Sequence, residues 1–160
     1  MKPLPLPLPL ALGLLIASPV LGQDQPPLVA LPPYDAALAV RLGADERGMK
    51  SYVFVLLKTG PKTDIPKDDR AKMFAGHMTN LGRLAAEGKL VVAGPMVKND
   101  RHYEGIFIFN VKTVKEAEAL LATDPAVAGG ALGFEAYGWY GSAALQETFG
   151  IHARIDKTGR

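Results

Sequence analysis

Residues 72–96 read KMFAGHMTNLGRLAAEGKLVVAGPM, and this stretch contains a helix, a glycine stop, a short strand and a Gly-Pro turn. Phe74, Met78, Leu81 and Ala85 recur at steps of three and four residues, which is the spacing of one face of an α-helix. His77 lies beside this apolar stripe. An imidazole that faces the core is either a structural histidine satisfied by a hydrogen bond or a functional residue, and the pattern alone leaves both open.

The segments on either side of this stretch predict the remaining elements. Residues 51–58, SYVFVLLK, are rich in β-forming residues and almost continuously apolar, as expected of a central strand. Residues 103–111, YEGIFIFNV, alternate two sets of apolar side chains and predict a third strand. A capping box formed by Thr113 and Glu116 begins a second helix. Residues 132–140 supply the last strand.

The predicted order is therefore β-α-β-β-α-β. This order is typical of the ferredoxin-like α+β fold, in which an antiparallel sheet of four strands carries two helices on one face. The opposite face of such a sheet is bare, and these strands have enough apolar side chains for both faces. An apolar face of that size is expected to be covered by a second copy of the chain, so the sequence predicts a homodimer.

The first 22 residues have the pattern of a secretory signal peptide. A lysine at position 2 precedes an uncharged run, residues 3–22, that ends in small residues, so we expect cleavage after Gly22 and a periplasmic or secreted protein. The alternating prolines Pro5, Pro7 and Pro9 argue against a stable membrane-spanning helix, and after cleavage no membrane span is expected. A retained N-terminal anchor is the alternative.

The rest of the chain divides into three parts. Residues 23–48 are expected to form a proline-rich arm with a short helix, capped by Asp35 and ended by Gly43. Residues 49–145 form the α+β domain. Residues 146–160 are expected to be a charged C-terminal tail without a clear periodic pattern.

Composition and spacing exclude several classes of function. The formal net charge is only +2 and no charge run is present, so nucleic acid is not an expected partner. Cysteine is absent, which excludes disulfides and thiolate chemistry. The three histidines, His77, His102 and His152, lie far apart without an HxH or HxxxH spacing, so no metal site is predicted. No serine sits in a nucleophile elbow.

Four short motifs on this frame resemble the YCII-related (YciI-like) domain: residues 76–78, 87–90, 93–95 and 122–125. The resemblance extends over about 49–145, and it implies a dimeric α+β barrel of two sheets face to face. It also implies a pocket lined by His77, Asp124, Gly94 and Pro95. The family includes a dehydrochlorinase that acts on a chlorinated hydroxyhydroquinone, and muconolactone isomerase is a more distant structural cousin. A small aromatic or lactone-like substrate is thereby implied.

The chemistry expected of these residues has a structural alternative in each case. Asp124 before a proline is a common helix cap, yet a cap uses only one carboxylate oxygen and leaves the other free to orient His77. Such a pair suits proton abstraction beside a carbonyl or from a phenol. Gly94-Pro95 is either a turn that ends a strand or a place where backbone approaches a ligand.

Three functions remain open from the sequence. The first is a small lyase or isomerase that uses His77 and Asp124 without a metal or organic cofactor. The second is a dimer that binds a small molecule in the same cleft without catalysis. The third is haem-dependent chemistry with His77 as an axial ligand.

Overall fold

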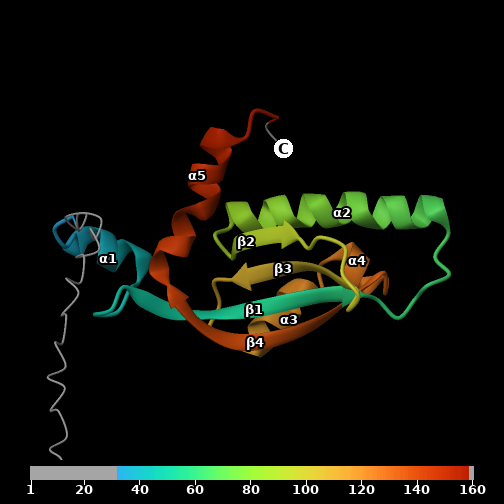
Figure 1. Ribbon diagram of the computed structural model, residues 1–160, viewed down its shortest axis with the longest axis horizontal. Helices are drawn as coiled ribbons and strands as arrows, with labels where there is room; N and C mark the ends of the chain where they lie inside the picture. Colours follow the sequence, from blue (N-terminus) through green and yellow to red (C-terminus); the bar gives the residue numbers. More distant parts are fainter. Residues whose placement is uncertain (1–31, 159–160) are drawn as a thin grey trace, which may run out of the picture. The chain divides into compact units, whose positions relative to one another are not determined.

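The computed structural model describes residues 32–158, and its centre is a sheet of four strands in the order β2-β3-β1-β4 (Figure 1). All three neighbouring pairs are antiparallel, so the predicted α+β class and ferredoxin-like order are confirmed. The elements of this unit are β1 (Met49–Thr59), α2 (Lys67–Ala86), β2 (Leu90–Pro95), β3 (Tyr103–Phe109), α3 (Val114–Leu121), α4 (Pro125–Ala128) and β4 (Leu132–Ser142).

The main core lies between the sheet and helices α2 and α3. Alternate residues of β1, including Val53 and Val55, point into it and meet Leu84 from α2 and Leu121 from α3. Because successive side chains of a strand point to opposite faces, the residues between them lie on the other side of the sheet. The capping box at the start of α3 is present as predicted, with Thr113 and Glu116 bonding each other's backbone amides.

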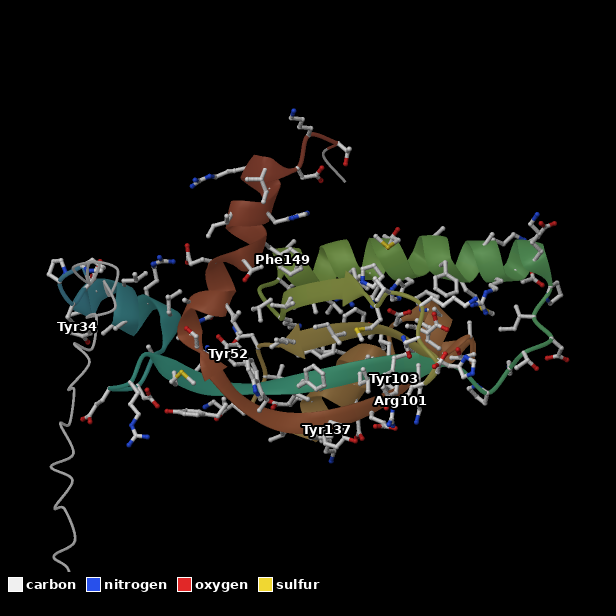
Figure 2. All side chains as sticks on the ribbon, viewed as in Figure 1. Tyr34, Tyr52, Arg101, Tyr103, Tyr137 and Phe149 are labelled. Atoms are coloured by element: carbon white, nitrogen blue, oxygen red, sulfur yellow. The ribbon has the colours of Figure 1, made fainter. Side chains whose placement is uncertain are left out.

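The second face of the sheet carries a smaller apolar cluster. Tyr52 and Ile108 are buried there with Val91, and Phe54 packs against them half-buried. Farther along this face the side chains of β4 are open to solvent, with Tyr137 53% exposed and Trp139 39% exposed. Figure 2 labels Tyr52 and Tyr137, one on each of the two neighbouring strands.

The C-terminal segment differs from the expected tail. After β4 the chain forms a 3-10 helix, η1 (Ala143–Glu147), and a helix, α5 (Thr148–Ile155). Leu145 of η1 packs on the cluster of the second face, and Phe149 of α5 packs against the main core. Figure 2 shows Phe149 beside the C-terminal end of α2, so this segment is held by tertiary contacts rather than by its own periodicity.

The N-terminal arm is described only from residue 32. Its short helix, α1 (Ala36–Leu42), is capped by Asp35 and ended by Gly43 in the left-handed conformation, φ 62°, as predicted. The expected signal peptide, residues 1–22, lies outside the described residues, as does most of the proline-rich arm. Within residues 32–158 no helix is long and apolar enough to cross a membrane.

Candidate active site

The structure brings His77 and Asp124 together in the core. Nδ1 of His77 lies 2.7 Å from Oδ2 of Asp124, which is hydrogen-bond distance. The side chains are 10% and 1% exposed, so the pair is almost completely buried. His77 comes from the sheet-facing side of α2, and Asp124 comes from the junction of α3 and α4, 47 residues later.

Asp124 serves both of the uses that its sequence context predicted. Its Oδ1 accepts a hydrogen bond of 2.9 Å from the backbone amide of Ala126 and caps α4, with Pro125 in the first turn. Its Oδ2 is left for the His77 ring. The cap fixes the carboxylate's orientation, so the helix start also aims the oxygen that meets the histidine.

Charge and hydrogen bonding keep this carboxyl ionised. Burial alone raises the pKa of Asp124, but the hydrogen bond and charge of His77 and the amides of Ala126 and Val127 outweigh it, and the pKa lies below its usual value. A carboxylate at this position accepts the proton of Nδ1. The neutral ring is therefore held in the tautomer whose lone pair is on Nε2.

The second ring nitrogen of His77 is open. Within the described part of the chain, Nε2 has no hydrogen-bond partner, and no side-chain nitrogen or oxygen there is both unpaired and sealed from solvent. Two aromatic side chains lie near the ring, with centroids 5.8 Å away for Phe74 and 5.9 Å away for Phe107. The Phe107 ring is stacked at 26° to the imidazole. The imidazole whose Nε2 is unpaired thus has two aromatic rings beside it.

Gly76 lets the two halves of the site approach each other. A Cβ at this position would lie 2.8 Å from Cγ of Pro125, closer than real contacts allow. The residue before His77 and the residue after Asp124 therefore touch, and any side chain on Gly76 would push α4 away from α2. The sequence indicated Gly76 only through the resemblance to a known domain.

Gly94 and Pro95, which the sequence predicted as a turn, are instead the last two residues of strand β2, one strand away from the ring. Ala93 of β2 pairs with Phe107 of β3, and Pro95 pairs with Gly105 at the end of the same ladder. A Cβ at Gly94 would meet nothing within 4 Å, whereas one at Gly105 would lie 2.8 Å from the Gly94 carbonyl oxygen. The close approach of β2 and β3 here thus requires glycine at position 105, which sequence reasoning did not single out. The predicted ligand contacts of Gly94 and Pro95 stay a prediction.

A polar network that sequence reasoning missed lies one turn along α2. Oδ1 of the buried Asn80 accepts hydrogen bonds from Arg83 Nη2, at 2.7 Å, and from Thr123 Oγ1, at 3.1 Å. Thr123 precedes Asp124, so this network joins the helix that carries His77 to the loop that carries Asp124. The available signal was a polar residue three positions after His77, on the same buried side of the helix.

The other histidines lie away from the pair. His102 occupies the β2–β3 connection with a positive φ of 56°, and His152 lies on the exposed surface of α5. Across residues 32–158 no three side chains of the metal-ligating types lie close enough to hold an ion.

The family model for the YCII-related domain matches residues 52–137. No curated protein matches the chain. One similar solved structure is the 5-chloro-2-hydroxyhydroquinone dehydrochlorinase of Burkholderia phenoliruptrix AC1100, in complex with 2,5-dihydroxybenzoquinone. It is 20% identical with a TM-score of 0.40, and the match covers 54% of this chain and 92% of that one.

A second solved structure is a dimeric protein of unknown function and ferredoxin-like fold from Bacteroides fragilis NCTC 9343. It is 12% identical with a TM-score of 0.40, and the match covers 57% of this chain and 95% of the other. The family match spans more than half of the chain, from Tyr52 in β1 to Tyr137 in β4, and includes both members of the His–Asp pair. The chain therefore belongs to the YCII-related domain family.

Proposed function

We propose that this protein is a small lyase or isomerase in which His77 moves a proton and Asp124 orients it, with no metal or organic cofactor. The observation that carries the proposal is the 2.7 Å pairing of Nδ1 with a buried carboxylate while Nε2 stays open. A histidine that served only packing would need neither a fixed tautomer nor a free lone pair on the side away from its partner.

The reaction follows from the charges in the pair. Nε2 takes a proton from a carbon beside a carbonyl, or from a phenol, and the ring becomes an imidazolium. The Asp124 carboxylate stabilises that cation through Nδ1–H. The electron pair left on the substrate then either expels a leaving group or moves along a conjugated system. In the first case the enzyme is a lyase, and the imidazolium gives its proton to the leaving group or to water. In the second case the enzyme is an isomerase, and Nε2 returns the proton to another atom of the molecule.

We also propose that the working unit is a homodimer joined through the second face of the sheet. Support comes from the apolar side chains that this face leaves open in one copy, among them Phe54, Trp139 and Tyr137. A second copy of the same face would cover them and close a barrel of two sheets.

Deuterium exchange tests the proton transfer even while the substrate is unidentified. Small ketones, lactones and hydroxylated aromatic compounds are incubated with the protein in D2O, and exchange at carbon is followed by NMR. Wild-type protein should exchange at least one compound class, and His77→Gln should remove the activity. Asp124→Asn should lower the rate by about a hundredfold or more, because without the carboxylate His77 loses its fixed tautomer and, with it, much of the about 10²–10⁴-fold that a general base contributes.

His152→Gln is the matched control, because it removes a histidine from the exposed surface of α5. It should exchange like the wild type. Equal exchange by wild type and His77→Gln would contradict the proposal. A wild-type protein that binds these compounds without exchanging them would support the second function, a dimer that binds small molecules.

A further inference from the structure

We infer that the molecule taken up beside His77 is a small planar anion, an aryl or enol acid, and that Arg70 binds its negative group. This inference rests on the proposed function and names its substrate class. It comes from the arrangement of three side chains on α2, Arg70, Phe74 and His77, and from the absence of an acidic partner for Arg70 among the described residues.

The three residues lie on one side of the helix. Arg70 and His77 are seven positions apart, so they point in nearly the same direction two turns from each other, with Cα atoms about 10 Å apart along the axis. Phe74 lies between them. The guanidinium carbon of Arg70 is 4.9 Å from the centre of the Phe74 ring, and that ring is 5.8 Å from the His77 ring.

Among the described residues, the guanidinium of Arg70 has no acidic partner. Within the described residues, the ion pairs formed by α2 side chains join Lys72 to Asp69, Arg83 to Glu87 and His77 to Asp124, and Arg70 takes part in none. A guanidinium that lies over an aromatic ring still presents its N–H groups along the edge. Those donors match the two oxygens of a carboxylate, or one phenolate or enolate oxygen.

The surroundings favour a flat molecule. Phe74 and Phe107 both lie close to the imidazole, and aromatic rings prefer offset or edge-on contact with other rings. Figure 1 shows the N-terminal half of α2 extending past the end of β2, so this part of the helix is not covered by that strand. A substituted ring beside Phe74 would place its acid group at Arg70 and its exchangeable proton at Nε2.

This placement also assists the chemistry. Removal of a proton by His77 leaves negative charge on the conjugated substrate, and a fixed cation at its far end stabilises that charge. Arg70 is then a residue that binds substrate and sets specificity, whereas Asp124 acts on the base.

A pair of probes of nearly the same shape, one an anion and the other neutral, tests the inference. The full-length protein is titrated with benzoate or with benzamide at constant ionic strength, and the Hε1 signal of His77 is followed by NMR. We expect benzoate to bind at least about tenfold more tightly than benzamide, a factor that corresponds to about 1.4 kcal/mol. Arg70→Met should remove this preference and leave the folded spectrum intact.

Lys72→Met is the matched control, because it removes the same charge from the other side of the same helix, where the Lys72 side chain is 81% exposed. It should keep the preference for benzoate. Arg70→Gln provides a second neutral variant should the methionine variant fold poorly. Equal binding of the two probes by the wild type, no response of His77 to benzoate, or equal losses in the Arg70 and Lys72 variants would overturn the inference.

The experiments can disprove the proposed function and this inference independently of each other. If His77 exchanges no proton but benzoate retains its Arg70-dependent advantage, the proton-transfer function falls and the anion site stands. If exchange depends on His77 but the charge of the probe makes no difference, the base stands and Arg70 has no part in binding.

Discussion

At the scale of single residues, the site depends on one carboxylate that does two things. Asp124 caps a helix with one oxygen and holds His77 with the other, so its ionised state contributes to folding as well as to the proposed chemistry. Its pKa in the folded protein is lowered from the usual value of 3.8. Ionisation of Asp124 therefore stabilises the fold at pH values above the usual pKa. This contribution is lost as the pH falls through the lowered pKa of the folded protein.

This predicts how stability depends on pH. The difference in unfolding free energy between wild type and Asp124→Asn should be largest near neutral pH and should shrink as the solution is acidified below about pH 4. Urea unfolding at a series of pH values measures it. Glu87→Gln is the comparison, since Glu87 pairs with Lys89 and Arg83 on the exposed surface, where solvent screens the pairs, and its loss should change stability much less. A difference for Asp124→Asn that is constant over the whole range would contradict the prediction.

The residue-level expectations succeeded where the signal is local in sequence. The cap at Asp124 could be predicted because Asp-Pro at a helix start involves consecutive residues. The contact with His77 crosses 47 positions, and the sequence placed both groups on one face of the sheet without fixing the distance. Asn80 and Gly105 were missed for a related reason, since their importance depends on what lies opposite them: Thr123 and the Gly94 carbonyl oxygen.

At the scale of elements, the approach of α4 to α2 sets the geometry of the pair, and Gly76 permits it. Gly76→Ala places a methyl group 2.8 Å from Pro125, so α4 must move away from His77. We expect a loss of about 1–3 kcal/mol in stability from overpacking, together with a changed His77 side-chain NMR signal. Thermal unfolding and the Hε1 resonance measure the two effects.

Gly82→Ala is the internal control on the same helix. A Cβ at Gly82 would meet nothing within 4 Å. Alanine there should stabilise the protein by about 0.5–1 kcal/mol, because glycine is a poor helix former. If both substitutions raised the melting temperature equally, close packing at Gly76 would not be a constraint on the site.

Regular elements were predictable where one period dominates. The stripe of α2, the capping box of α3 and the alternation in β3 each identify an element from the sequence alone. The predicted apolar face of α2 was wrong at Met78, which is 63% exposed, because the buried side of the helix runs through His77, Asn80 and Leu84. The helix α5 carries no such pattern: its sequence, TFGIHARI, places a glycine in its interior and leaves Ile151 and Ile155 exposed. Contacts of Phe149 with the distant core hold it, and they have no counterpart in local sequence.

At the scale of the whole molecule, the two faces of the sheet differ in how they are covered. Helices α2 and α3 bury one face, while η1 covers only part of the other through Leu145. The remainder of that second face carries exposed aromatic side chains of β4. Exposing such an apolar face to water is unfavourable for a monomer. One face of a four-stranded sheet has an area on the order of 800 Å², which is what each partner buries in a standard interface.

The assembly can be tested by one substitution on each side of the sheet. Wild-type protein at micromolar concentration should sediment at twice the mass of its chain. Trp139→Arg places a charge on the open face and should shift the protein to a monomer, because an unpaired charge is costly inside an interface. Met78→Lys adds the same charge on the outer side of α2, in the layer that covers the other face, where Met78 is 63% exposed, and should leave the dimer intact. Circular dichroism separates dissociation from unfolding in both variants. A wild-type monomer, or a dimer that tolerates Trp139→Arg but not Met78→Lys, would place the contact between copies elsewhere and leave the open face to another partner.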